Sequence, residues 1–337
     1  MRRDPNRVRE NLCMNFRSSS RALIIGLVFL LSATWALAAA SHPPTKAKSL
    51  RPLKRHPVVA LTFDDVPTGG GLQAGETRTA IITRLTDVLK ANHLEGIYGF
   101  VVGADLADDA DAREALRTWV AAGMNIGNHT WSHPSLSGVS AAEFERQIAL
   151  DDTLLAPYAQ GRDWRWFRYP YLEEGDTLAK RNQVRAWLRE HGYRIAEVTL
   201  NFNDDDWSDP YDRCTARNDT AALAWLQQSY LENAAAMIRL GRQEEQLAFG
   251  HEIPNVLLLH ETAFTTLMLP RLLELLRREG FRFAPLARVE RNPAYALDPA
   301  AGLPEGGPLT NQFLNSRHIA YPPFQPEPEQ RLESVCQ

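Results

Sequence analysis

Polar side chains suited to acid–base and metal chemistry follow several apolar stretches of this 337-residue sequence. Asp64 and Asp65 end the first of these stretches, and His129 and His133 follow a later one, four residues apart. Two histidines and a carboxylate leave an open position on a zinc-like ion, which is typical of catalytic rather than structural sites. A lone histidine pair at this spacing is common in ordinary surfaces and cores, so the prediction depends on the two aspartates.

The spacing of the two histidines predicts that both imidazoles lie on one helical turn and face the same point. The adjacent aspartates are expected to differ, because a carboxylate held by a metal stays ionised while its neighbour is free to take a proton. An alternative for Asp64 and Asp65 is a helix cap or an Asx turn.

Seven short apolar stretches alternate with segments of helical periodicity from Val58 onward. The predicted strands span Val58–Phe63, Ile97–Val102, Asn125–Gly127, Arg165–Tyr169, Arg194–Leu200, Asn255–Leu259 and Phe281–Leu286. Helices are predicted at Thr79–Asn92, after the capping box formed by Ser140 and Glu143, and at Ala263–Arg278. The alternation predicts an α/β fold, a distorted (β/α) barrel of about seven parallel strands. Polar residues that follow the strands are then expected at one rim of the barrel.

The amino terminus has the features of a targeting segment. Residues 22–36 form an uncharged apolar stretch, Arg17 and Arg21 precede it, and three alanines ending at Ala40 follow it. This pattern predicts a cleaved signal peptide over residues 1–40 and export to the periplasm or the exterior, with an uncleaved anchor as the alternative. The basic, proline-containing residues 41–57 are predicted to be a linker.

The rest of the chain is expected to form one catalytic domain, residues 58–292, and a Pro/Gly-rich irregular tail, residues 293–337. Cys214 and Cys336 remain after processing, and the sequence leaves open whether they pair. With 37 Lys and Arg residues against 41 Asp and Glu residues, the net charge of −4 gives no indication of a nucleic-acid partner. No protein partner is implied.

Five motifs, taken together and in this order, resemble those of the polysaccharide deacetylases, the NodB-homology or carbohydrate esterase 4 group. They are Thr-Phe-Asp-Asp ending at Asp65, His-Thr-x-x-His from His129, Arg-x-Pro-Tyr from Arg168, Asp-Trp ending at Trp207, and Leu-x-Leu-His ending at His260. The resemblance covers Val58 to about Leu286. The fourth motif departs from the family pattern, because Asn203 stands where an Asp is usual and three aspartates crowd against the tryptophan.

The resemblance implies that Asp65, His129 and His133 bind one divalent metal, usually zinc, which activates a water molecule. Asp64 would be the general base, held ionised and oriented by Arg168. His260 would be the general acid that protonates the departing amine.

The same resemblance implies further residues around the substrate. The backbone N–H of Tyr171 would stabilise the developing oxyanion. One of Asp204, Asp205 and Asp206 would tune His260, and we take Asp206 as the candidate. Trp207 and Leu258 resemble the residues that enclose the acetyl methyl group, with plain core packing as the alternative.

The predicted function is that of a secreted, metal-dependent deacetylase of N-acetyl groups on an amino-sugar polymer or oligosaccharide. Peptidoglycan, chitin-like chains and poly-N-acetylglucosamine are compatible glycan substrates. One alternative is a non-catalytic, metal-retaining glycan-binding protein of the envelope, which would not need Asp64, Arg168 and His260. Another is a hydrolase of a different non-peptide C–N bond, whose relatives tend to lack the full metal triad.

Overall fold

The computed structural model describes residues 56–67, 69–300, 306–323 and 329–337. The chain divides into two units, and all described residues belong to the second, Lys54–Gln337. The predicted signal peptide and all but the last residues of the predicted linker lie outside the described residues. Among the described residues, none of the helices has the length and apolar character that crossing a membrane requires.

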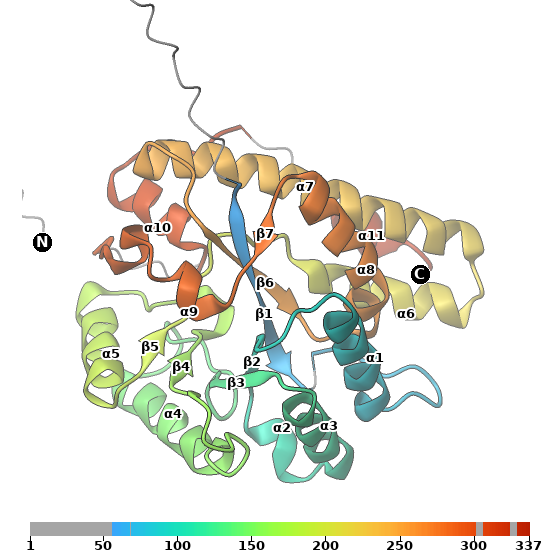
Figure 1. Ribbon diagram of the computed structural model, residues 1–337, viewed down its shortest axis with the longest axis horizontal. Coiled ribbons are helices and arrows are strands. Elements are labelled where there is room, and N and C mark those ends of the chain that lie inside the picture. The colour runs from blue at the N-terminus through green and yellow to red at the C-terminus, as the bar shows by residue number, and fades with distance from the viewer. Residues whose placement is uncertain (1–55, 68, 301–305, 324–328) are drawn as a thin grey trace, which may run out of the picture. The chain divides into compact units, whose positions relative to one another are not determined.

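A parallel sheet of seven strands forms the centre of this unit, with helices packed around it (Figure 1). The strands are β1 (Val58–Val66), β2 (Tyr98–Val101), β3 (Asn125–Asn128), β4 (Trp166–Phe167), β5 (Arg194–Ile195), β6 (Asn255–His260) and β7 (Arg282–Phe283). Their order is β5-β4-β3-β2-β1-β6, and β7 pairs with the first residues of β1. Each of the seven predicted strands is present, which confirms the predicted α/β fold.

The predicted fifth strand, Arg194–Leu200, is shorter than expected because the chain changes partners within it. Its first part hydrogen-bonds to β4, with the Ala196 N–H donating to the Phe167 carbonyl over 2.7 Å. Its last part reaches β6, where Leu200 and Leu257 form an isolated parallel bridge. One segment thus joins the two ends of the curled sheet and makes it barrel-like.

The helices agree with the periodicity of the sequence. They are α1 (Arg78–Ala91), α2 (Ala104–Ala107), α3 (Ala110–Ala121), α4 (Ala141–Leu155), α5 (Leu178–Glu190), α6 (Ser208–Ala216), α7 (Thr220–Phe249), α8 (Ala263–Arg278), α9 (Leu286–Val289), α10 (Leu309–Ser316) and α11 (Glu329–Ser334). Three 3₁₀ turns are η1 (Pro170–Leu172), η2 (Asp204–Trp207) and η3 (Pro293–Ala296). The Ser140 hydroxyl caps α4 by accepting from the Glu143 N–H over 3.1 Å, as the capping box predicts.

Alternate residues of each strand face opposite sides of the sheet. In β1, Val59, Leu61 and Phe63 pack outward in the large core shared with α1, α3 and α8. Ala60 belongs instead to a separate inner cluster, which also contains Phe100 and Trp166. The inner space is narrow at Gly127, where a Cβ atom would lie 2.5 Å from the Phe100 ring. Inward-facing residues at the ends of the strands therefore converge.

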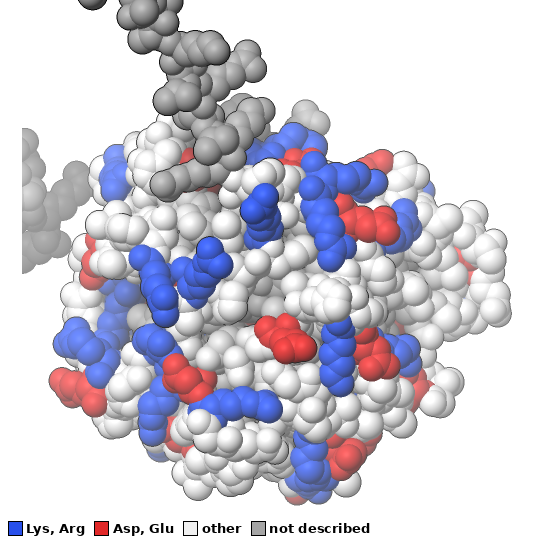
Figure 2. Space-filling view, viewed as in Figure 1, with Lys and Arg blue, Asp and Glu red and all other residues white. Residues whose placement is uncertain are grey.

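The segment after Pro293 is more ordered than its composition predicts, and the expectation of an irregular tail is wrong for two parts of it. Helices α10 and α11 form there, and Leu309, Phe313 and Leu314 of α10 bury a small apolar cluster. Cys214 of α6 and Cys336 form a disulfide, which answers the question the sequence left open. On the face shown in Figure 2, basic and acidic side chains are interspersed over the helices.

Candidate active site

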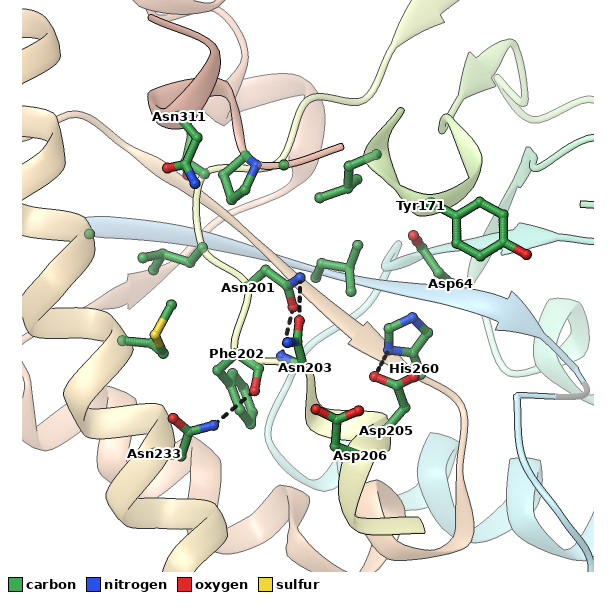
Figure 3. Close-up of a pocket in the computed structure, with 18 of the residues that line it drawn as sticks. Asp64, Tyr171, Asn201, Phe202, Asn203, Asp205, Asp206, Asn233, His260 and Asn311 are labelled. Atoms are coloured by element: carbon green, nitrogen blue, oxygen red, sulfur yellow. Dashed lines mark hydrogen bonds and ion pairs between the residues drawn. The ribbon is translucent and has the colours of Figure 1, made fainter. Parts of the chain in front are cut away.

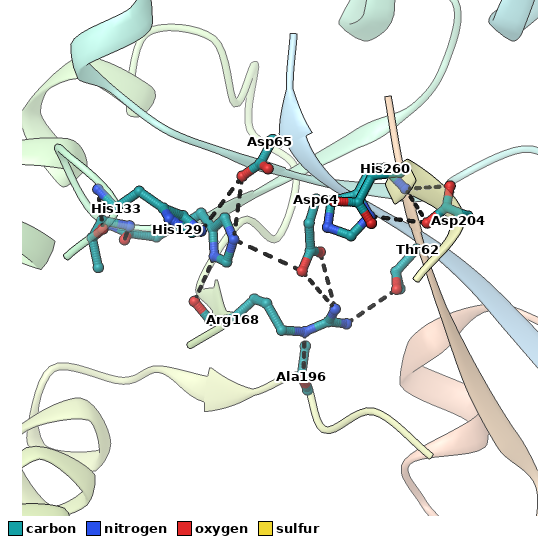
Figure 4. Close-up of polar contacts among 12 residues, drawn as sticks. Thr62, Asp64, Asp65, His129, His133, Arg168, Ala196, Asp204 and His260 are labelled. Atoms are coloured by element: carbon teal, nitrogen blue, oxygen red, sulfur yellow. Dashed lines mark hydrogen bonds and ion pairs between the residues drawn. The ribbon is translucent and has the colours of Figure 1, made fainter. Parts of the chain in front are cut away.

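The predicted site residues meet at the carboxyl ends of the central strands (Figure 4). Asp64 on β1 and His260 on β6 are paired in register, so their side chains start from neighbouring positions. Arg168 follows β4, and His129 follows β3. The period-two alternation that points Ala60 inward also points Asp64 inward, four residues later.

Asp65, His129 and His133 form a three-residue cluster with the geometry of a metal site. One ligand atom from each lies within 4.8 Å of the others, and the Asp65 carboxylate is 3.6 Å from Nε2 of both histidines. Asp65 reaches the cluster although it follows the inward-facing Asp64, because its backbone turns to a φ of 60°. Its Oδ1 atom is buried without a hydrogen-bond partner among the described residues. A divalent cation fits this donor set.

The surroundings of His129 fix its tautomer and keep it neutral, as a metal ligand requires. Its Nδ1 is 2.8 Å from the Arg168 carbonyl oxygen, so Nδ1 carries the proton and the Nε2 lone pair faces the cluster. Burial, and then the nearby His133, lowers the pKa of His129 well below its usual value. Burial also lowers the pKa of His133. Both imidazoles are therefore neutral at neutral pH, as metal binding requires.

The prediction that the two histidines share a helical turn is wrong. Residues 129–135 form a loop, in which Thr130 and His133 adopt positive φ values of 71° and 53°. The hydroxyl of Thr130 accepts from the His133 N–H over 3.0 Å and holds the loop. Pro134 disfavours helical geometry at the residue before it. The rings nevertheless meet, with centroids 4.8 Å apart.

Asp64 is buried and paired with Arg168, as predicted. Nη1 of Arg168 donates to both carboxylate oxygens of Asp64, over 2.9 and 3.1 Å. The guanidinium also donates to the Thr62 hydroxyl and the Ala196 carbonyl, which fixes its plane. Burial raises the pKa of Asp64 to about 6 and outweighs the opposing charge of Arg168. Asp64 is therefore a base whose pKa lies just below neutral pH.

His260 is held by an aspartate of the fourth motif, and that aspartate is Asp204. Its carboxylate lies 2.9 Å from Nδ1 of His260, accepts from the His260 backbone N–H, and accepts from the Thr265 hydroxyl over 2.6 Å. Asp205 forms a second ion pair with His260 at 3.2 Å. The prediction that Asp206 holds His260 is therefore wrong, because Asp204 is the residue that accepts these hydrogen bonds from His260.

The charge state of His260 follows from these contacts. Burial lowers its pKa, but the hydrogen bond and charge of Asp204, with the charges of Asp205 and Asp65, raise it to about 10. His260 is therefore an imidazolium at neutral pH. Its Nδ1 is engaged by Asp204, which leaves Nε2 as the nitrogen that can give a proton to a ligand.

The remaining predicted residues line one cavity of about 630 Å³ beside these groups (Figure 3). Trp207 and Leu258 are buried in its wall, and the Trp207 indole donates to the Ser229 hydroxyl over 2.9 Å. Tyr171 also lines the cavity, and its ring packs against His133 at a centroid distance of 4.5 Å. Its φ of 58° turns the chain directly after Pro170.

Two further residues of the site, Thr62 and Thr265, were not predicted from the sequence. Thr62 accepts a hydrogen bond from Arg168, and Thr265 donates one to Asp204. Thr62 was recognisable, because it lies two residues before Asp64 and therefore faces the same side of β1. No local pattern marked Thr265, which reaches Asp204 from the first turn of α8.

Comparisons with known proteins identify the same family that the sequence motifs resemble. Residues 53–196 match the family model for polysaccharide deacetylases. A chitooligosaccharide deacetylase of Sinorhizobium fredii is 30% identical over 155 residues, which are 46% of this chain and 61% of that protein. A chitin deacetylase of Arthroderma benhamiae is 25% identical over 155 residues, which are 45% of this chain and 36% of that protein.

Among solved structures, a family 4 carbohydrate esterase from Streptomyces lividans in complex with acetate has a TM-score of 0.44 at 22% identity. The similarity covers 68% of this chain and 92% of that one. The chain spans less than two thirds of the length of both curated relatives.

Proposed function

Residues 53–196 belong to the polysaccharide deacetylase family, and on that premise we propose that this protein is a metal-dependent deacetylase of an N-acetylated glycan. The observation that carries the proposal is the presence of a base, an acid and a metal-ligand cluster in one cavity. Asp64, His260 and the cluster of Asp65, His129 and His133 all line it.

Each side chain of the site has its own role in the proposed amide hydrolysis. Asp64, ionised at neutral pH, accepts a proton from the attacking water, and Arg168 keeps its carboxylate oriented. His260, protonated through its contact with Asp204, donates a proton to the departing amine. The backbone N–H of Tyr171 is the proposed donor to the developing oxyanion. Asp65, His129 and His133 would hold a divalent cation, which would supply Lewis-acid activation of water and of the acetyl carbonyl.

We propose zinc as the cation, because two imidazoles and one carboxylate are ligands that zinc prefers in open catalytic sites. We also propose that the protein is exported. The predicted signal peptide supports this proposal, and so does the disulfide between Cys214 and Cys336, since such bridges persist in oxidising compartments.

Two observations favour this function over its alternatives. A glycan-binding protein has no use for a buried Asp64–Arg168 pair and a charged His260, because burying charges is costly and binding needs no proton transfer. A hydrolase of another C–N bond is disfavoured by the complete metal cluster and by the names of the relatives, which are deacetylases of chitin and chitooligosaccharide.

The test is acetate release by residues 41–337 from N-acetylated glycans and from acetylated xylan, after metal removal and reloading with zinc. We expect zinc-dependent release from N-acetylated substrates. Asp64→Asn is expected to lower kcat by about 10²–10⁴-fold with unchanged zinc affinity. Asp87→Asn, on the exposed face of α1, is the matched control and should leave the rate unchanged. Zinc binding with no acetate from any glycan would refute the proposal.

A further inference from the structure

Glu261 is a buried residue directly after the proposed general acid His260, and the proposed reaction makes no use of its carboxyl group. The residue is only 2% exposed. Its Oε1 atom has no hydrogen-bond partner among the described residues. Burying a carboxyl group with an incomplete set of hydrogen bonds is costly. We therefore looked for a role of Glu261 other than stabilising the fold.

Glu261 contacts the chain on both sides of the proposed metal ligand Asp65. Strands β1 and β6 pair as far as Asp64 and His260, which lie at adjacent strand ends (Figure 4). Glu261 continues this ladder by one residue, because its backbone N–H donates to the Asp64 carbonyl over 3.4 Å. Its carboxyl group accepts from the backbone N–H of Gly69, four residues after Asp65. One residue thus holds the chain immediately before and shortly after the ligand.

The loop that follows β1 lies so close to Glu261 that a side chain would not fit at its nearest position. A Cβ atom at Gly69 would lie 2.6 Å from the Glu261 carbonyl oxygen. A Cβ atom at Gly70 would lie 3.3 Å from Cβ of Thr262. Arg78, the first residue of α1, also holds this loop and donates to the Gly70 carbonyl over 3.4 Å. The position of the loop is therefore set by the segment that follows His260.

The backbone conformation of Asp65 requires such support. Its φ of 60° lies in the left-handed region, which is uncommon for residues other than glycine. Residues in such conformations persist when the surrounding structure holds them. The Asp65 carboxylate lies 3.6 Å from Nε2 of both His129 and His133. Loss of the contacts with Glu261 should therefore move this carboxylate relative to the two imidazoles.

We propose that Glu261 is a positioning residue, whose hydrogen bonds on both sides of Asp65 place the Asp65 carboxylate for binding the divalent cation. The inference rests on the proposed metal-dependent function and adds to it a residue outside the metal cluster. A residue that only filled space could be replaced by an apolar side chain of similar size without any effect on metal binding.

The first experiment compares two substitutions of Glu261. Glu261→Met keeps the length of the side chain and removes the acceptor, whereas Glu261→Gln keeps an oxygen that can accept from the Gly69 N–H. Burial raises the pKa of Glu261 well above its usual value, so a neutral amide is a close match for the carboxyl group. Calorimetric titration of the metal-free proteins with zinc should show affinity at least about tenfold weaker for Glu261→Met, and within about threefold of the unmodified protein for Glu261→Gln.

Two further readouts separate positioning from a general loss of structure. The urea midpoint of metal-free Glu261→Met should stay close to that of the unmodified protein, because the lost hydrogen bond is offset by the removal of a buried polar group. Cobalt(II) in place of zinc reports the ligand geometry through its visible absorption. The spectrum should change in Glu261→Met and be restored in Glu261→Gln. A Glu261→Met variant that binds zinc as tightly as the unmodified protein would overturn the inference.

A second pair of variants tests the same contact from the loop, and it decides the matter if Glu261→Met does not fold. Gly69→Ala places a Cβ atom against the backbone of Glu261 and should push the loop away. Gly71→Ala is the matched control, because among the described residues its Cβ would meet only the movable carboxylate end of Asp212, at 3.0 Å. We expect Gly69→Ala to weaken zinc binding at least about tenfold and Gly71→Ala to leave it unchanged. Equal zinc affinities of these two variants would contradict the role of Glu261.

The outcomes distinguish this inference from the proposed function. If the unmodified protein binds no zinc and releases no acetate, the proposed function and the inference fail together. If it binds zinc and releases acetate, and Glu261→Met binds zinc equally well, the deacetylase stands and the positioning role of Glu261 alone is rejected.

Discussion

Replacing Asp204 with Asn tests whether this buried carboxylate sets the charge of His260. The substitution keeps the shape of the side chain and an oxygen for the hydroxyl of Thr265, but it removes the negative charge 2.9 Å from Nδ1 of His260. Burial, which lowers the pKa of His260, remains. The pKa of about 10 should therefore fall.

The size of the fall follows from the strength of a close ion pair. An opposite charge in contact shifts a pKa by about 1–3 units, and each unit corresponds to about 1.4 kcal/mol. A fall of about 2 units would change the protonated fraction of His260 at pH 9 from about nine tenths to about one tenth. Asp205 and Asp65 remain near the ring and limit the fall.

The assay is an NMR titration of the His260 imidazole in the metal-free protein, between pH 5 and pH 11. Asp209→Asn is the matched control, because it removes an exposed carboxylate of the neighbouring helix α6, and it should leave the pKa of His260 near 10. An Asp204→Asn variant whose imidazole still titrates near pH 10 would refute the reasoning.

The contact between His260 and Asp204 also makes the stability of the fold depend on pH. The pKa of His260 is raised from 6.5 to about 10 on folding, so the stabilisation is complete below pH 6.5 and is lost as the pH rises through 10. The difference in unfolding free energy between the unmodified protein and Asp204→Asn should therefore shrink in alkaline solution.

Three other predictions concern the metal, a buried acid and the disulfide. Asp65→Ala should weaken zinc binding by more than tenfold in calorimetric titration, because it removes one of the three proposed ligands. Burial raises the pKa of Glu245 from 4.5 to about 7, so the folded protein loses about 3 kcal/mol of stability as the pH rises between these values. Glu245→Gln should remove that loss, seen as a higher urea midpoint than the unmodified protein at pH 8 but not at pH 4. Cys336→Ser opens a disulfide between residues 122 positions apart, and calorimetry should show a loss of about 2–5 kcal/mol.

The strands and the inward positions of the site could be predicted, because period-two alternation acts locally. The apolar stretch from Val58 specifies both β1 and the side on which Asp64 lies. The identity of the aspartate beside His260 could not be predicted in the same way. Asp204, Asp205 and Asp206 are consecutive in a 3₁₀ turn, so they point in three directions about 120° apart. Only the orientation of that turn against β6 buries Asp204.

The conformation of the loop that carries His129 and His133 could not be predicted from the spacing of the two residues. A spacing of four residues is compatible with a helical turn, but it is also compatible with a loop that contains left-handed residues, as residues 129–135 do. The carboxyl-terminal helices were missed because proline and glycine near them dominated the composition. The apolar residues Leu309, Phe313 and Leu314 at helical spacing were the available signal.

The position of β1 in the sheet has a consequence for how the protein acquires its fold. β1 lies between β2, its near neighbour in the chain, and β6, and the hydrogen bond from Thr62 to Leu257 joins residues 195 positions apart. Contacts between such distant residues slow folding, because a long loop must close before they form. The pairing of Asp64 with His260 is among these contacts. A chain still emerging from the ribosome therefore cannot complete its centre, and it remains in an incompletely folded form until most of its length has been synthesised.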